Sequence, residues 1–302
     1  MIVSEKIKEY CPEINIETIS EKQVDSLGLA SCNKVPICGF IGSTKFVNGV
    51  SDQVKTVIIN ESLIEKFDSN KIGLIIVDNP QDTFWKLHQI MHNDYEYVRP
   101  KKDTVISENA KVGDYVSISN NNVVIEDDVV IEDFVTIYEN TYIKKGSVIR
   151  SGSRLGGVGF QEYKNKNRIE TINHYGGVII GENVDIQNNA CIDRALFPWE
   201  DTIIGDETKI DNMVHIAHAV EIGKGCEIAA NAVIAGRCVI GDNVWIGLGA
   251  LIKNFAIIGN DSRVNIGSVV VNEVSDGGSV SGNYAVDHKR FLFTQMRINK
   301  IK

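Results

Sequence analysis

Aliphatic residues recur at every sixth position along most of this chain. One register holds Ile, Leu or Val everywhere except at Pro198, with a one-residue shift after Ile118 and a break after Leu155. A period of six fits neither the 3.6-residue turn of an α-helix nor a heptad. It fits three short strands to a coil of 18 residues, with coils stacked at ~4.8 Å so that each covers its neighbour's apolar edge. The pattern therefore predicts a triangular parallel β-helix. The register runs through Ile106, Val112, Ile118, Ile125, Ile131, Ile137, Ile143, Ile149, Leu155, Ile180, Ile186, Ile192, Pro198, Ile204, Ile210, Ile216, Ile222, Ile228, Ile234, Ile240, Ile246, Ile252, Ile258, Val264 and Val270.

The two ends of the chain lack this period. Near the start, the apolar runs 55–59 and 72–77 predict buried strands, and Asn79-Pro80 predicts the start of a helix. Near the end, Phe291, Leu292, Gln295, Ile298 and Ile301 recur at helical spacing. We therefore expect a small α/β domain over residues 1–100, the β-helix over 101–276 and a short basic helical tail over 277–302.

Two interruptions leave the six-residue register. The first covers residues 156–177, and the second lies near 195–200 and adds six residues without shifting the register. Loops that project from a rigid solenoid often carry function. The six cysteines form no C-x-x-C pair, so we expect them to remain thiols; they are Cys11, Cys32, Cys38, Cys191, Cys226 and Cys238.

The charge balance limits the partners of this protein. The chain has 31 Lys and Arg against 40 Asp and Glu, a net charge of −9, which argues against binding to a nucleic-acid polymer. No stretch reaches the ~18 uncharged apolar residues that a transmembrane helix needs, and the first residues lack the apolar core of a signal peptide. We expect a cytoplasmic protein without a transmembrane segment.

Two histidines stand beside the inward residue Ile216. His215 and His218 should both face outward, where an imidazole can act as a base near neutral pH or simply be solvated. Gly236 follows His218 by 18 residues, so it should lie one coil away, ~4.8 Å along the stack. A glycine lets a thioester approach the backbone, and its N–H can stabilise an oxyanion.

These motifs resemble the hexapeptide-repeat acyltransferases, and most closely the UDP-3-O-acylglucosamine N-acyltransferase family of lipid A synthesis. The stretch from Asp211-Asn212 to Ile216-Ala217-His218 is similar to the family's I-D-N…I-A-H motif. The resemblance implies a left-handed β-helix, a homotrimer with active sites between neighbouring prisms, His218 as general base, and Asn212 and Gly236 in the catalytic site. Other stretches agree in order: Gly157-x-Gly159-Phe160, 177–181, Ile192-Asp-Arg194, 202–205 and Ala235-Gly236.

The segment from Cys38 to Phe46 resembles the family's uridine-binding segment, in which two aromatic rings flank the base. Phe40 and Phe46 are the matching positions, and Ser43 stands where the family commonly has Asn. The resemblance implies a nucleotide-linked amino sugar, carried on UDP or dTDP. Further substrate contacts are expected from Asp211, His215 and Phe160.

The acyl donor is expected to be an acyl-CoA or acyl carrier protein, with no tightly bound cofactor. Arg237 and Lys253 face outward in successive coils, where they could hold the phosphates of coenzyme A or remain solvated. The family commonly has a second His where this chain has Phe255, and its C-terminal helical region is usually longer. Both departures favour a short acyl-CoA.

The leading hypothesis is therefore an N-acyltransferase that moves a 3-hydroxyacyl group onto a nucleotide-linked amino sugar for surface-glycan synthesis. The alternative is the UDP-3-O-acylglucosamine N-acyltransferase of lipid A synthesis, which uses acyl carrier protein. Two remote alternatives stay open. One is a zinc enzyme like the β-helical carbonic anhydrases, in which His215 and His218 would need a third ligand from a neighbour's His174 or His288. The other is a non-enzymatic scaffold.

Overall fold

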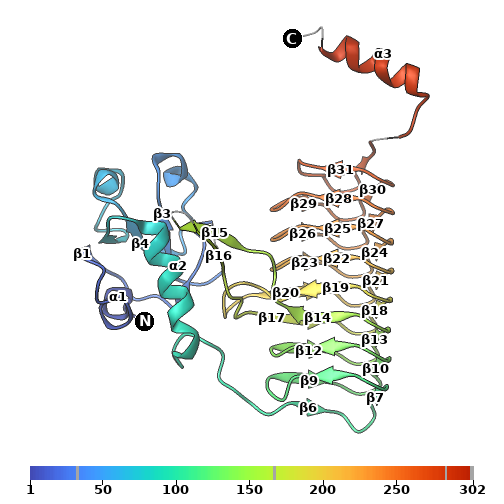
Figure 1. Ribbon diagram of the computed structural model, residues 1–302, viewed down its shortest axis with the longest axis horizontal. Helices are drawn as coiled ribbons and strands as arrows, with labels where there is room; N and C mark the ends of the chain where they lie inside the picture. Colours follow the sequence, from blue (N-terminus) through green and yellow to red (C-terminus); the bar gives the residue numbers. More distant parts are fainter. Residues whose placement is uncertain (32–33, 166–167, 283, 300–302) are drawn as a thin grey trace.

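The computed structural model describes residues 1–31, 34–165, 168–282 and 284–299. Its larger part is a triangular prism of stacked coils, built from three parallel sheets (Figure 1). Face 1 consists of β6 (Val105–Ile106), β9 (Val123–Ile125), β12 (Thr141–Ile143), β17 (Gly177–Ile180), β20 (Asp201–Ile204), β23 (Glu221–Ile222), β26 (Val239–Ile240) and β29 (Ile257–Ile258). Face 2 consists of β7 (Lys111–Val112), β10 (Val130–Ile131), β13 (Val148–Ile149), β18 (Asp185–Ile186), β21 (Lys209–Ile210), β24 (Glu227–Ile228), β27 (Trp245–Ile246), β30 (Arg263–Val264) and β32 (Ser279–Val280). Face 3 consists of β8 (Ser117–Ile118), β11 (Thr136–Ile137), β14 (Arg154–Gly157), β19 (Cys191–Asp193), β22 (His215–Ile216), β25 (Val233–Ile234), β28 (Leu251–Ile252) and β31 (Val269–Val270).

The six-residue register forms the core of the prism, as predicted. The register residues of the central coils, such as Ile143, Ile180 and Ile216, are fully buried. Val112, in the first coil, is 43% exposed because no coil covers it from below. The sharp corners need a left-handed backbone, and asparagine adopts this backbone more readily than most residues. It does so at Asn122, Asn183, Asn189, Asn231 and Asn243, where φ lies between 54° and 59°.

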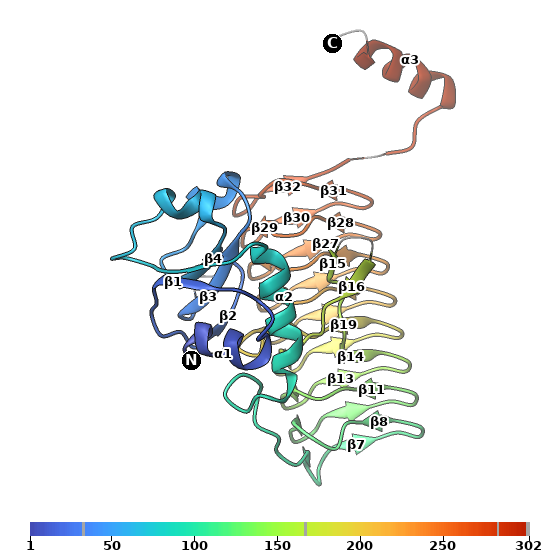
Figure 2. The ribbon, with the colours of Figure 1, turned by 60° about the vertical axis from the view of Figure 1, so that its left-hand side comes forward.

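The N-terminal part is a five-stranded sheet in the order β1-β5-β4-β3-β2. Its helix α2 begins as the sequence predicts, because the side-chain oxygen of Asn79 accepts a hydrogen bond from the Asp82 N–H at 3.2 Å. Figures 1 and 2 show α2 between this sheet and the prism. The elements are α1 (Val3–Tyr10), β1 (Glu17–Ser20), β2 (Ser26–Leu27), β3 (Ile37–Ile41), η1 (Thr44–Gly49), β4 (Val54–Ile59), η2 (Glu61–Lys66), β5 (Gly73–Ile76), α2 (Pro80–Ile90) and η3 (Met91–Asn93).

Both interruptions of the register fasten the prism to the N-terminal part. The first contains a hairpin, β15 (Glu162–Asn165) and β16 (Arg168–Thr171), whose end is held by α2. There the Gln89 side chain donates to the Thr171 carbonyl at 2.9 Å and accepts from the Asn173 N–H at 2.9 Å. In the second, Phe197 is fully buried and stacks on Trp85, with ring centroids 6.3 Å apart. The N-terminal part therefore fixes the position of both loops.

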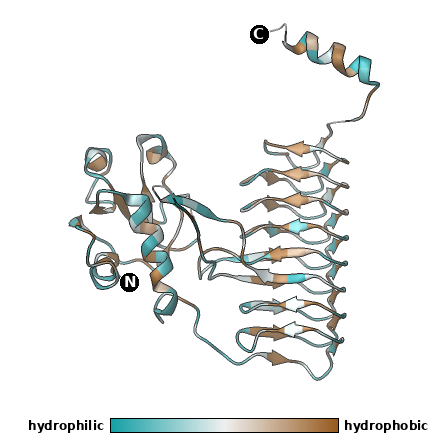
Figure 3. Ribbon diagram, viewed as in Figure 1, coloured by the Kyte–Doolittle hydropathy of each residue, from teal (hydrophilic) through white to brown (hydrophobic). Residues whose placement is uncertain are grey.

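Beyond the last coil, the chain ends in α3 (His288–Asn299), and Ile301 of the predicted apolar face lies outside the described residues. Figures 1 and 2 show α3 away from the prism, and its apolar side chains are exposed. Strands near this end of the prism are coloured as hydrophobic in Figure 3. Exposed members include Val239, Leu251, Ile257 and Val269. Among the described helices, none is long and apolar enough to cross a membrane.

Candidate functional site

The corner between face 3 and face 1 brings His218 and Gly236 together. His218 follows β22 and Gly236 follows β25, and these two strands are paired in register. A Cβ atom added to Gly236 would lie only 2.8 Å from both Cε1 and Nε2 of His218. The outer edge of the imidazole therefore lies against the Gly236 backbone. In the described residues, the N–H of Gly236 makes no hydrogen bond, so it is free to donate to a ligand.

The loop 156–177 folds over this corner. A Cβ added to Gly159 would lie 3.1 Å from His218 Cδ2, and the His174 ring meets the His218 ring edge to face at a centroid distance of 5.2 Å. As a result, His218 is only 9% exposed, although the sequence predicted an open surface position. The sequence placed His174 near His218 only through a neighbouring prism, and this was wrong. The hairpin returns His174 to the site of its own chain.

Burial keeps both imidazoles neutral. It lowers the pKa of His218 to about 3 and the pKa of His174 to about 4, because a charged ring loses its hydration there. At neutral pH, each ring therefore has one protonated nitrogen and one free lone pair. A general base needs such a lone pair.

A second pair of titratable groups lies on the neighbouring strands β19 and β22 of face 3. His215 Nε2 is 3.7 Å from Asp193 Oδ2, and His215 remains partly exposed. Burial raises the pKa of the Asp193 carboxyl to about 7 and lowers the pKa of His215. Asp193 was quoted in the resemblance but was not predicted as a site residue. Its spacing places it outward from Ile192, which was the available signal.

The buried histidines predict a loss of stability in mild acid. His88, His174 and His218 bind protons near pH 6.5 when unfolded but only near pH 3 to 4 when folded, so the unfolded state gains protons as the pH falls through this window. Between pH 7 and 5, each of these rings lowers the free energy of unfolding by about 2 kcal/mol. Asp193 raises it by about 2 kcal/mol, because its carboxyl binds a proton in the folded state in this pH range and in the unfolded state only at lower pH. We expect a net loss of about 4 kcal/mol in the free energy of unfolding. Urea unfolding followed by tryptophan fluorescence at both pH values checks this, and equal stabilities would contradict it.

Asn212 and Asp211 lie at a different corner, between faces 2 and 3. Asn212 follows β21 and His218 follows β22, so a whole face separates them. The Asn212 side-chain oxygen accepts from Asn188 Nδ2 at 3.0 Å, and Asp211 Oδ2 accepts from the Ala230 N–H at 3.1 Å. Within one chain, both side chains therefore connect neighbouring coils and lie away from His218. Their predicted roles at the substrate amine require a neighbouring prism.

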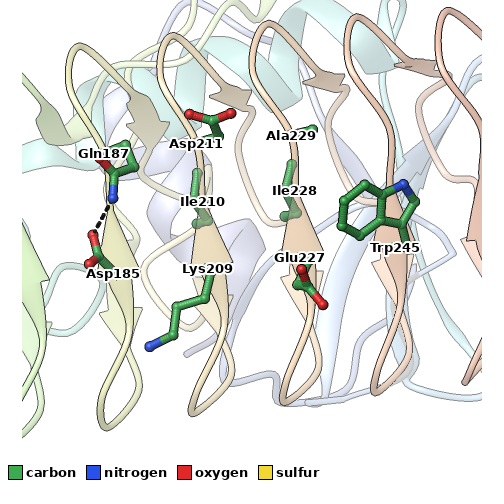
Figure 4. Close-up of a pocket in the computed structure, with 9 residues that line it drawn as sticks. All are labelled: Asp185, Gln187, Lys209, Ile210, Asp211, Glu227, Ile228, Ala229 and Trp245. Atoms are coloured by element: carbon green, nitrogen blue, oxygen red, sulfur yellow. Dashed lines mark hydrogen bonds between the residues drawn. The ribbon is translucent and has the colours of Figure 1, made fainter.

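Figure 4 shows a hollow on face 2, and neither His218 nor Gly236 lines it. It lies beside β18, β21, β24 and β27, and at one end the Gln187 amide donates to Asp185 of the same coil at 3.0 Å. Trp245 closes one end, as the figure shows. Because it opens on another face, it does not serve chemistry at His218 within one chain. Its lining is Asp185, Gln187, Lys209, Ile210, Asp211, Glu227, Ile228, Ala229 and Trp245.

Of the two residues expected to bind the phosphates of the acyl donor, Arg237 is already paired within the chain. Arg237 forms two hydrogen bonds to Glu200, at 2.6 and 2.9 Å, and its guanidinium lies 5.8 Å from the centroid of the Phe197 ring. The insertion at 195–200 supplies both partners, which the register alone could not indicate. Lys253 is exposed, and no ion pair to it occurs in the described parts of the chain. Lys253 is therefore available to bind a phosphate, whereas the charge of Arg237 is neutralised by Glu200.

A cavity lies beside this pair, between the N-terminal part and face 1. It is adjacent to the His218 corner, since Ala219 and Arg237 directly follow His218 and Gly236. Its wall combines aromatic side chains with charges of both signs. The lining is Ser31, Lys34, Trp199, Glu200, Asp201, Ile203, Ala219, Glu221, Arg237, Val239 and Phe255.

The two expected base-stacking rings lie in different surroundings. Phe40 is half-buried in β3 and packs on Phe84 at a centroid distance of 4.9 Å. Phe46 is 57% exposed in η1, and Ser43 precedes that turn with its side chain exposed. Phe160, in the loop over His218, is 87% exposed. Phe46, Ser43 and Phe160 are therefore accessible to a ligand, whereas Phe40 contributes mainly to the core.

No group of three His, Cys, Asp or Glu side chains with the geometry of a metal site occurs in the described residues, although His174 and His218 are adjacent. The cysteines that the structure describes are free thiols, and Cys32 lies outside the described residues.

Comparison with known proteins agrees with the six-residue repeat. The family model "Bacterial transferase hexapeptide (six repeats)" matches residues 122–157 and 201–236. A UDP-3-O-acylglucosamine N-acyltransferase of Caulobacter sp. is 34% identical over 141 residues, which is 47% of this chain and 41% of that protein. A probable UDP-3-O-acylglucosamine N-acyltransferase 2 of Arabidopsis thaliana is 37% identical over 133 residues, 43% of this chain and 42% of that protein. The chain thus spans about two fifths of the length of these curated relatives.

Solved structures show the same fold. The UDP-N-acetylglucosamine O-acyltransferase of Moraxella catarrhalis superposes with a TM-score of 0.52 at 25% identity, over 64% of this chain and 74% of that one. LpxA from Acinetobacter baumannii gives a TM-score of 0.54 at 24% identity, over 66% and 75%. The predicted fold class, mainly β with a left-handed parallel β-helix, is confirmed. The chain therefore resembles the hexapeptide-repeat transferases in sequence over residues 122–157 and 201–236, and shares their fold.

Proposed function

We propose that this protein is an N-acyltransferase that transfers an acyl group from a thioester to the amino group of a nucleotide-linked amino sugar. The observation that carries the proposal is the corner where a neutral, buried His218 lies against the backbone of Gly236, whose N–H is free among the described residues. A base and an oxyanion donor that face the same space are what acyl transfer to an amine requires.

The reaction follows from this geometry. The substrate amine attacks the thioester carbonyl, a C–N bond forms, and the carbonyl oxygen becomes an oxyanion that accepts from the Gly236 N–H. His218 Nε2 takes the proton that the nitrogen must lose. The tetrahedral intermediate then breaks its C–S bond, and the imidazolium returns the proton to the leaving thiolate. The pKa of His218 is low in the protein without substrate. The negative charge that develops on the adjacent oxyanion raises this pKa during the reaction.

The acceptor we propose is a UDP-linked 3-O-acylglucosamine, the second of the two acceptors expected from the sequence. Both curated relatives described above carry that substrate in their names, and they match the chain over less than half of their length. Phe46 and Ser43 are accessible in the segment expected to bind the base. The donor would reach the corner past Phe255 and the free Lys253, as acyl carrier protein or acyl-CoA.

A homotrimer would complete the site. The outward residues Leu251 and Val269 on face 3, and Val239 and Ile257 on face 1, are each 45% to 51% exposed in one chain. Aliphatic rows of this kind on two faces suit burial against neighbouring prisms. Such packing would also bring a neighbour's Asp211 and Asn212 within reach of the groove at His218.

Product analysis tests the proposal. The purified protein is incubated with UDP-3-O-acylglucosamine and other UDP- and dTDP-amino sugars, with 3-hydroxymyristoyl carrier protein, 3-hydroxybutyryl-CoA or acetyl-CoA as donor. We expect an amide-linked acyl product on UDP-3-O-acylglucosamine, detected by mass spectrometry. A short acyl product on another amino sugar would instead support the surface-glycan reading, which Phe255 favours. No product with any pair would contradict acyl transfer.

A further inference from the structure

Two buried ring nitrogens at the His218 corner lack partners. Among the described residues, only four buried side-chain polar atoms make no hydrogen bond, and two of them are His174 Nε2 and His218 Nδ1. An unpaired buried polar atom destabilises the folded state, so two in adjacent rings require an explanation.

The hydrogen bonds of His174 determine which of its nitrogens is protonated. His174 Nδ1 lies 3.0 Å from the carbonyl oxygen of Ile172. A carbonyl oxygen can only accept, so Nδ1 carries the proton. Because burial keeps the ring neutral, Nε2 must then be an unprotonated acceptor. The unpartnered nitrogen of His174 therefore needs a donor.

His218 has the complementary need. To take a proton at Nε2 next to Gly236, its neutral ring must carry a proton on Nδ1. That Nδ1–H is a donor without an acceptor. The two unpartnered atoms are thus one donor and one acceptor, in rings whose centroids are 5.2 Å apart.

A half-turn of the His218 ring brings these two atoms to the same side. A Cβ on Gly159 would lie 2.9 Å from His174 Nε2 and 3.1 Å from His218 Cδ2, so the His174 nitrogen and the Cδ2 edge face the same point. Rotation by 180° about Cβ–Cγ exchanges Cδ2 with Nδ1 and leaves the shape of the ring unchanged. It also exchanges Cε1 with Nε2, and both positions lie 2.8 Å from the Gly236 Cβ site. Nε2 therefore stays at Gly236 in either orientation.

We propose that His218 works in this rotated orientation, with its Nδ1–H donating to Nε2 of His174, which makes His174 a positioning residue for the general base. This rests on the proposed function, in which His218 is that base. The third group that orients a catalytic base is often a carboxylate. Here the residue after His218 is Ala219, and a neutral imidazole from the loop takes that place.

The fold holds His174 firmly enough for this role. The carbonyl of Asn173 is 2.8 Å from His88 Nε2, and the Asn173 N–H donates to Gln89 at 2.9 Å. Both partners are on α2, so the N-terminal part fixes the backbone beside His174. His174 itself is only 3% exposed.

Histidine ring NMR tests the hydrogen bond without any substrate. We would record ¹⁵N spectra of the ring-labelled protein at pH 7 and assign His218 and His174 with the His218→Ala and His174→Phe variants. The expected result is a proton on Nδ1 of His218, and its loss of protection from exchange in His174→Phe. A proton on Nε2 of either ring in the wild-type protein would overturn the proposal.

Kinetics test the positioning role. His174→Phe keeps the ring size but removes the acceptor, whereas His174→Gln keeps an acceptor atom. We expect His174→Phe to lower kcat about 30-fold with KM for the amino sugar nearly unchanged, and His174→Gln to recover most of the loss. His92→Phe, at an exposed position in η3, is the matched control and should match the wild type.

The outcomes separate this proposal from the proposed function. A kcat of His174→Phe within about 3-fold of the wild type, or equal losses in the Phe and Gln variants, would overturn the positioning role. If the ring spectra show the hydrogen bond but no amino sugar is acylated, the pairing stands and the proposed function falls.

Discussion

Replacing His218 by alanine is expected to lower kcat for N-acyl transfer at least ~100-fold, which corresponds to ~2.7 kcal/mol of lost transition-state stabilisation. The His218 imidazole is the base that lies beside the free N–H of Gly236. His174 does not replace it in His218→Ala, because the lone pair of His174 Nε2 lies near Gly159, on the Cδ2 side of the imidazole. Steady-state kinetics with the best acceptor and donor found by product analysis measure the effect.

Loss of fold is the competing explanation for an inactive His218→Ala protein. The side chain is buried, so its removal leaves a cavity beside Gly159. Thermal unfolding by circular dichroism separates the two effects, since a purely catalytic loss leaves the melting temperature within a few degrees. A folded variant that retains near wild-type kcat would remove His218 from the mechanism.

The prism was predictable because its cause is local and repeated. Each inward aliphatic residue, such as Ile216, pairs in register with residues of the same kind in the next coil, so a period of six is enough to define strands, corners and core. The same period of 18 residues per coil correctly predicted that Gly236 lies one coil away from His218, beside it. The helix from Pro80 was also readable, since Asn79 and Pro80 are local start signals.

The loops could not be predicted, because their positions depend on contacts far away in the sequence. Glu200 neutralises Arg237 only because the insertion turns back across the corner, and His174 reaches His218 only because α2 holds the hairpin end. Neither contact leaves a periodic signal. The motif of Asp211, Asn212 and His218 misled in a different way. Neighbours in sequence were taken as neighbours in one site, whereas six residues carry the chain along a full face of the prism.

Gly236→Ala keeps the backbone N–H but is expected to lower kcat by about 100-fold, because the added methyl group displaces the general base and occupies the place of the oxyanion. The new methyl group would lie 2.8 Å from Cε1 and Nε2 of His218, which is closer than real Cβ contacts, so the imidazole or the backbone must shift. The space in which the oxyanion forms would be filled at the same time.

The fold itself should tolerate this substitution, which makes the test sharp. Side chains occupy the equivalent corner positions one coil to either side, His218 and Asn254, and Gly236 does not have the left-handed backbone that would strain an alanine. We therefore expect a melting temperature close to that of the wild type. Gly49→Ala, where an added Cβ meets nothing within 4 Å, is the matched control. If Gly236→Ala kept wild-type kcat, the space between Gly236 and the His218 imidazole would not be where the thioester carbonyl binds.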